Sequence, residues 1–168
     1  YASSYISTSS YFYRDQGGIS SSGETRSYAL RFRPRIVTGT QNLLNRVERD
    51  QIILVGNELR ANIYAWMLGS NYLSYSGISA NTWYSVCITR NGTTGEQNLY
   101  VNGALVDSGI LSDAGSSTGG FGIGSRTGGE DSYADADFAN ASIWTRELTA
   151  EEAARLHNNG NDLDYADL

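Results

Sequence analysis

Residues 138–156 read FANASIWTRELTAEEAARL, and they predict a β-strand that leads directly into a short helix. The first seven residues include aromatic and β-branched side chains, which are enriched in strands. Thr149 followed by Glu152 is a capping box, in which the hydroxyl accepts a bond from an N–H group of the first turn and the carboxylate reaches back to the cap. The alanine-rich run that follows favours a helix near residues 150–158, and Gly160 is placed to end it.

Turn signals divide the rest of the chain into short strand-like runs. The chain has 168 residues, 19 of them Gly and one Pro. The strand-like runs are 28–33, 51–56, 61–68, 83–90, 98–102, 121–124 and 137–144. Residues 43–50 leave two alternatives open, a helical turn or a further strand. Strands at this spacing with one terminal helix predict an all-β, two-sheet antiparallel sandwich that forms a single domain over residues 1–168.

Three segments of the chain resemble one known family. The run IWTRELTAEE at 143–152 follows the family pattern of a hydrophobic and an aromatic residue, then Arg, Leu, Ser or Thr, and Glu. The run WYSVCITRNG at 83–92 resembles a strand that begins with Trp, and NLYVNG at 98–103 resembles its hairpin partner. The chain thus resembles the laminin-G-like jelly rolls of the concanavalin A-like lectin/glucanase superfamily. The resemblance implies a jelly roll whose first strand lies near its last, with Trp83 in the core.

The balance of charges argues against one class of partner. The chain carries 12 basic residues, all Arg, and 18 acidic ones, for a net charge of −6. Residues 1–84 hold eight Arg and five acids, whereas residues 85–168 hold four Arg and thirteen acids. Nucleic-acid binding needs a basic footprint, so we expect no nucleic-acid partner. No apolar run approaches 18 residues, which predicts no membrane span, and no signal peptide is visible.

The sequence lacks the patterns that catalysis on this architecture needs. Glycosidases related to the resembled family use two carboxylates on one strand in a Glu-x-Asp-x-x-Glu pattern, and this pattern is absent. The chain has one His and one Cys, His157 and Cys87. A lone Cys between Val86 and Ile88 is predicted to be a buried hydrophobic residue. We therefore expect a protein without catalytic residues.

An acidic cluster suggests a metal site. Four carboxylates lie within eight residues, at Glu130, Asp131, Asp135 and Asp137. Calcium prefers hard oxygen ligands of this kind, and the resemblance implies Ca²⁺ at a loop rim. The family often has Asp where this chain has Ala139. A solvated acidic loop is the alternative interpretation.

Aromatic and arginine side chains suggest a ligand surface. The chain has 12 Tyr and three Trp, and flat aromatic rings stack against sugars. Strict alternation would place Asn62, Tyr64 and Trp66 together on one face of a strand. The same alternation gives Arg31 and Arg33 one face of an earlier strand, together with Arg35. The predicted ligand-binding residues are Asn62, Tyr64, Trp66, Arg31 and Arg33, and an ordinary solvent-facing sheet surface is the alternative.

These observations leave three functional classes. The resemblance most directly implies a non-catalytic carbohydrate-binding or adhesion module that recognises a glycan or a glycosylated surface. The alternative is a structural or decoration protein of a virus particle or cell-surface appendage, working as a homo-oligomer or with a capsid partner. A glycosidase or lyase is a remote third class. The first two imply a location outside the cell, on its surface or on a virion.

Overall fold

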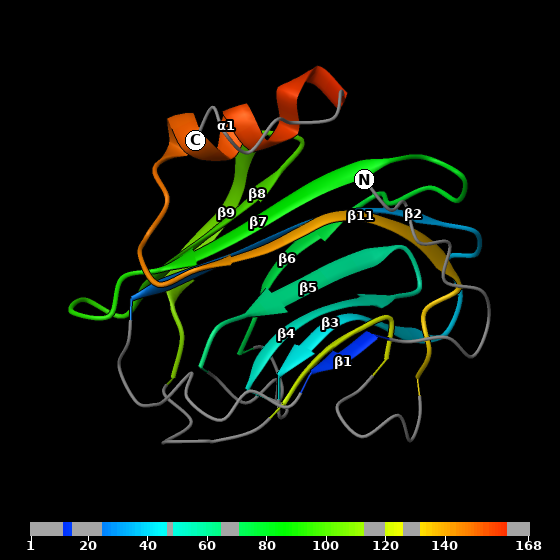
Figure 1. Ribbon diagram of the computed structural model, residues 1–168, viewed down its shortest axis with the longest axis horizontal. Helices are drawn as coiled ribbons and strands as arrows, with labels where there is room; N and C mark the ends of the chain where they lie inside the picture. Colours follow the sequence, from blue (N-terminus) through cyan, green and yellow to red (C-terminus); the bar gives the residue numbers. More distant parts are fainter. Residues whose placement is uncertain are drawn as a thin grey trace.

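Two antiparallel β-sheets stack face to face, and one short helix packs on the outside of the second sheet (Figure 1). This arrangement confirms the predicted sandwich with a C-terminal helix. The structure is a computed structural model, and it describes residues 12–14, 25–46, 49–64, 71–112, 120–125 and 132–160.

One sheet has six strands in the order β1-β10-β3-β4-β5-β6. Its strands are β1 (Phe12–Arg14), β3 (Thr40–Arg46), β4 (Asp50–Val55), β5 (Glu58–Asn62), β6 (Leu73–Ser76) and β10 (Phe121–Ile123). The other sheet has five strands in the order β11-β2-β7-β8-β9. Its strands are β2 (Arg26–Pro34), β7 (Tyr84–Arg90), β8 (Glu96–Val101), β9 (Ala104–Ile110) and β11 (Ala136–Trp144).

The pairing of the chain ends differs in part from the prediction. The first strand, β1, pairs with β10 and not with the last strand. It is β2 that pairs with β11, from Ala136 opposite Pro34 to Trp144 opposite Ser27. Residues 40–46 form strand β3, so the structure favours the strand alternative for the start of segment 43–50.

The main core fills the space between the two sheets. Tyr28, Leu30 and Phe32 alternate along β2 and point into it, and Val86 and Ile88 do the same along β7. Alternation assigns the intervening residues of both strands to the outer face of the five-stranded sheet. These outward positions become important for the functional site.

A buried carboxylate organises one end of the core. Asp50 is fully buried and accepts hydrogen bonds from Arg26 Nη1 and Arg46 Nη1, both at 3.1 Å. It also accepts a bond from the Tyr28 hydroxyl and, at 2.7 Å, from the backbone N–H of Tyr64. Because a buried charge is costly without such partners, this set of bonds is needed to keep Asp50 inside the sandwich.

Helix α1 (Ala150–His157) covers part of the outer face of the five-stranded sheet. Its predicted capping box is confirmed: Glu152 N–H donates to Thr149 Oγ1 at 3.2 Å, and Thr149 N–H donates to the Glu152 carboxylate at 2.8 Å. The helix ends at Asn158, which takes the left-handed conformation at φ 42°. The prediction that Gly160 ends the helix was wrong, because Asn158 reaches the left-handed region two residues earlier and its amide tolerates it.

A second, smaller core lies beneath this helix. Its members are the small or apolar side chains Ala29, Cys87, Tyr100, Leu148, Ala153 and Leu156. Trp144 is partly buried against them, as expected for a structural residue. The turn between β8 and β9 packs closely against helix α1 at Gly103, because a Cβ atom added there would stand 3.1 Å from Ala154 Cα. The Cys87 thiol is buried, as predicted, and burial raises its pKa to about 12, with a smaller contribution from the charge of Glu152.

Candidate functional site

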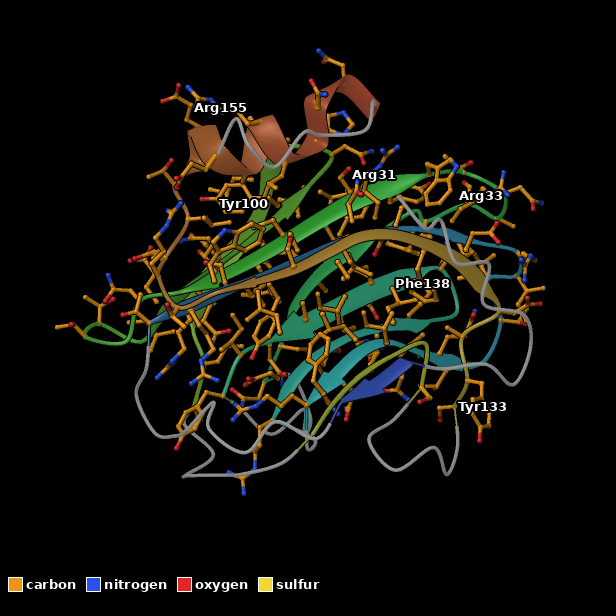
Figure 2. All side chains as sticks on the ribbon, viewed as in Figure 1. Arg31, Arg33, Tyr100, Tyr133, Phe138 and Arg155 are labelled. Carbon is orange, nitrogen blue, oxygen red and sulfur yellow. The ribbon has the colours of Figure 1, made fainter. Side chains whose placement is uncertain are left out.

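The outer face of the five-stranded sheet changes character where helix α1 ends. Along β2 the outward residues run from Ala29 under the helix to Arg31 and then Arg33 beyond it. Figure 2 shows Arg31 beside the end of the helix and Arg33 further along the same strand. On the neighbouring strand Ser85 pairs with Arg31, and Trp83 lies just before the start of β7. The uncovered part of the face therefore presents arginine and tryptophan.

Trp83 is 38% exposed, so the prediction that it belongs to the core was wrong. The reason is alternation: Tyr84, Val86 and Ile88 of β7 point inward, so Trp83 falls on the outer face. Two guanidinium groups lie near its ring, with Arg31 Cζ 5.5 Å and Arg33 Cζ 5.4 Å from the ring centroid. Contacts of this kind hold an exposed ring in place by cation–π attraction.

Two carboxylates fix the arginines beside this ring. Arg33 donates from Nε at 2.9 Å and from Nη2 at 2.6 Å to Asp137 Oδ2. Arg35 donates from Nη2 to Asp137 Oδ1 at 2.5 Å and from Nη1 to Asp135 Oδ1 at 3.1 Å. Asp137 stands opposite Arg33 in the β11–β2 pairing, so the sheet register itself brings these groups together.

We call this cluster the outer-face patch, and define it by six residues. They are Arg31, Arg33, Arg35, Trp83, Asp135 and Asp137. Three guanidinium groups against two carboxylates leave the patch with one net positive charge, although the whole chain carries −6. The hydrogen bond to Asp135 raises the pKa of Arg35, and the charge of Asp137 adds to the rise.

A small cavity lies between the patch and the helix. Its lining includes Arg31, Ser85, Asn140 and Gly103. His157 Nδ1 lies 3.3 Å from Ser85 Oγ at the same end of the helix. The cavity volume is about 10 Å³, which accommodates one water molecule and no sugar ring.

The predicted set Asn62, Tyr64 and Trp66 does not form an open face where the structure describes it. Asn62 is 0% exposed and Tyr64 is 2% exposed, so the prediction of solvent-facing side chains was wrong for both. The alternation fails because β5 ends at Asn62 and Tyr64 turns into the left-handed region at φ 58°. There Asp50 holds the Tyr64 N–H, and the Arg90 guanidinium lies 5.5 Å from the Tyr64 ring centroid. Trp66 lies outside the described residues.

Only two of the four predicted calcium ligands lie among the described residues. Glu130 and Asp131 lie outside the described residues, whereas Asp135 and Asp137 belong to the outer-face patch. Three of the four carboxylate oxygens of Asp135 and Asp137 accept guanidinium N–H bonds. Within the described ranges no group of three or more His, Cys, Asp or Glu side chains is arranged to hold a metal. Because calcium needs six to eight free oxygens, Asp135 and Asp137 as placed do not fit it.

Sequence reasoning placed three of the six patch residues, Arg31, Arg33 and Arg35, on one face, and the structure brings Arg31 and Arg33 together there. Arg31 is only 8% exposed, however, so it is less open to a ligand than predicted. Asp135 and Asp137 were selected for a different role, as calcium ligands.

Sequence reasoning missed Trp83 as a surface residue, although counting alternate positions back from Val86 would have placed it outside. It could not have paired Asp137 with Arg33, because the two are 104 residues apart and their contact depends on the register of β11 against β2.

Comparison with known families settles the class of the protein. Residues 7–154 match Laminin_G_3, the concanavalin A-like lectin/glucanases superfamily, and the chain belongs to this family. The match confirms the resemblance seen in the sequence. No curated protein matches the chain by sequence.

Three solved structures illustrate the shared fold. A native heptameric SAP-like pentraxin from Limulus polyphemus is 18% identical to this chain, with a TM-score of 0.62. The match covers 80% of this chain and 70% of the pentraxin chain. A "putative carbohydrate binding protein" from Bacteroides ovatus is 12% identical, with a TM-score of 0.69. The match covers 86% of this chain and 44% of that protein. The botulinum neurotoxin type G receptor binding domain is 17% identical, with a TM-score of 0.63. The match covers 89% of this chain and 42% of the toxin domain. At these identities the likeness shows the fold alone.

In the described part of the chain, no helix is long and apolar enough to cross a membrane.

Proposed function

We propose that this protein is a non-catalytic carbohydrate-binding or adhesion module, and that the outer-face patch is its glycan-binding site. The observation that carries the proposal is the exposure of Trp83, a large aromatic side chain in contact with two guanidinium groups. Two similar folds support it, since one is described as carbohydrate binding and another as receptor binding. A glycan ligand would place the protein outside the cell, on its surface or on a virion.

The chemistry of the patch suits a sugar ring. The C–H groups of a pyranose pack against a flat aromatic face, while guanidinium groups donate hydrogen bonds to hydroxyl oxygens. Arg31 and Arg33 also hold the Trp83 ring before a ligand arrives, so binding costs little ordering of that side chain. The salt bridges to Asp135 and Asp137 fix Arg33 and Arg35 in the same way.

The affinity for one sugar chain should be low. An open surface removes little of the ligand from water, so we expect dissociation constants of about 1 μM to 1 mM. Useful binding to a glycosylated surface then depends on several copies acting together. This dependence connects the carbohydrate-binding function with assembly.

The proposal is tested by titrating the protein with a panel of neutral and acidic oligosaccharides by calorimetry. Trp83→Ala should lose most of the binding. Tyr133→Ala is the matched control, because Tyr133 is also an exposed aromatic residue, at 40%, and Figure 2 shows it well apart from Arg31 and Arg33. A panel that binds equally well to Trp83→Ala and to the parent protein would contradict the proposed site, and a panel that does not bind at all would contradict the proposed function.

A second candidate function is structural assembly through the edge strand β9. This strand pairs only with β8 in the sheet order, and it carries the two most exposed large hydrophobic residues of the described chain, Ile110 at 73% and Leu105 at 55%. Exposed apolar edge strands are ready to pair with another chain. The candidate is tested by light scattering on Leu105→Ser with Ile110→Ser. An oligomer of the parent that becomes a monomer in the variant would support assembly, whereas a parent that stays monomeric at high concentration would exclude it for this chain alone.

A further inference from the structure

The outer-face patch has a surplus of hydrogen-bond donors over acceptors. Each guanidinium group carries five N–H donors and no acceptor. The two carboxylates of the patch engage Nε and Nη2 of Arg33 and both terminal nitrogens of Arg35. Among the described residues, Arg33 Nη1 has no hydrogen-bond acceptor. The Arg33 side chain is also open to solvent, with 39% of its surface exposed.

The charge of the patch, like its surplus of hydrogen-bond donors, favours an anionic ligand. Asp137 has only 5% of its side-chain surface exposed and lies beneath the arginines, whereas the side chains of Arg33 and Arg35 remain more than one-third exposed. A ligand that approaches from solvent thus meets the guanidinium groups of Arg33 and Arg35 before the Asp137 carboxylate, while Asp135 is 24% exposed and less open than either arginine. The whole chain carries a net charge of −6, whereas the patch carries one net positive charge, so the patch favours an anion that the overall charge of the chain would repel.

We propose that the outer-face patch selects acidic sugars, in which a carboxylate or sulfate group binds Arg33 while the sugar ring packs against Trp83. This inference rests on the proposed carbohydrate-binding function and names the ligand class of the same site. The planar guanidinium group matches a carboxylate or sulfate by paired N–H bonds, which a neutral hydroxyl cannot reproduce. The geometry is suitable because Arg33 Cζ lies only 5.4 Å from the Trp83 ring centroid, within the span of one sugar residue and its acidic substituent.

The test compares neutral disaccharides with acidic derivatives of them. Lactose, sialyllactose, sulfated lactose, cellobiose and the uronate of cellobiose are titrated into the parent protein at low salt. We expect the acidic sugars to bind at least about tenfold more tightly than their neutral counterparts, which corresponds to about 1.4 kcal/mol. The preference should shrink as salt rises to about 0.5 M, because screening weakens exposed charge pairs. The sulfated and carboxylated probes then show which of the two groups the patch prefers.

Two variants locate the preference. Arg33→Gln should reduce the acidic-to-neutral ratio to about one, and Arg33→Lys should keep part of it, because Lys retains the charge but loses the planar pair of donors. Arg155→Gln is the matched control, since Arg155 is an exposed arginine of helix α1 whose side chain is 58% exposed and pairs with Glu151. The control should keep the full ratio.

The outcomes separate the inference from the function it rests on. Equal binding of neutral and acidic sugars that depends on Trp83 would overturn the acidic preference and leave the carbohydrate-binding function standing. An acidic preference that survives in Arg33→Gln would also overturn the inference, because the anion would then bind elsewhere. If none of the five probes binds, both the preference and the carbohydrate-binding function are contradicted.

Discussion

The same two strands carry two different surfaces on the outer face of the five-stranded sheet. Beneath helix α1 the outward residues of β2 and β7 are Ala29 and Cys87, small side chains that leave room for Leu156 of the helix. Four residues away along the chain in each case, where no described segment lies over the sheet, the outward residues are Arg33 and Trp83. The sequence changes from small apolar to charged and aromatic at the point where the helix ends.

This comparison shows how to distinguish a structural surface from a functional one. A covered surface is selected for packing, so its residues should control stability and have no effect on ligands. The uncovered surface has little described structure to pack against, so its residues should affect ligand binding more than stability. The predictions that follow test this division of roles, beginning with the largest effect.

Leu156→Ala should destabilise the protein by about 3 kcal/mol, because Leu156 is buried between the helix and the sheet and truncation leaves a cavity. Urea unfolding followed by circular dichroism measures the change. The control is Leu105→Ala, an exposed leucine on β9, which should cost less than about 0.5 kcal/mol. Equal losses in both variants would mean that the helix is not packed as described.

Thr149→Ala should cost about 1 kcal/mol at neutral pH, because it removes the hydroxyl that caps helix α1. The variant should also expose Cys87 to thiol reagents more often, since the helix covers that residue. The rate of labelling by an aromatic disulfide, compared with the parent, provides the measurement. An unchanged rate would show that the cap does not hold the helix in place.

The capping box also predicts a dependence on pH. Hydrogen bonds from Arg146, and then from Thr149, lower the pKa of Glu152 from 4.5 to about 2. A carboxylate whose pKa is lower in the folded state stabilises the protein above its unfolded pKa, and this stabilisation is lost as the pH falls through the folded value. The advantage of the parent over Glu152→Gln should thus disappear between pH 4.5 and about 2. An advantage that is constant from pH 7 to 2 would contradict the ionised pairing.

Trp83→Ala should change stability by less than about 1 kcal/mol, because the exposed ring contributes mainly its cation–π contacts with Arg31 and Arg33. Thermal unfolding measures this effect under the conditions of the sugar titrations. A loss of about 3 kcal/mol or more would show that Trp83 is a core residue, as the family resemblance had implied.

Calcium should have the smallest effect. Millimolar Ca²⁺ should leave the melting temperature unchanged, because Asp135 and Asp137 are bound to guanidinium groups and a ligand shifts stability only when it binds the folded state. Differential scanning calorimetry with and without chelator is the measurement. A rise in melting temperature that disappears in Asp135→Asn with Asp137→Asn would restore the calcium site predicted from the acidic cluster.

Local patterns in the sequence predicted most of the fold. The capping box at Thr149 and Glu152 and most of the strand-like runs depend on neighbours within a few positions, and the structure confirms them. The predicted run 61–68 is the exception, because β5 ends at Asn62. The site was harder to predict because it depends on sheet register and on where strands end. Asn62 and Tyr64 were misplaced because Asp50 stops the alternation there by binding a backbone N–H group, and such a contact leaves no local signal in the sequence.

The central claim is that Trp83, and not another tryptophan, contacts the ligand. The chain has three Trp residues, so a nitrogen-15 labelled sample should give one indole N–H resonance each for Trp66, Trp83 and Trp144. These resonances are assigned by three Trp→Phe variants and then followed during titration with the tightest sugar of the panel. We predict that the Trp83 resonance shifts in proportion to saturation while that of Trp144 stays fixed. A shift confined to Trp66 or Trp144, with Trp83 unmoved at saturation, would contradict the account.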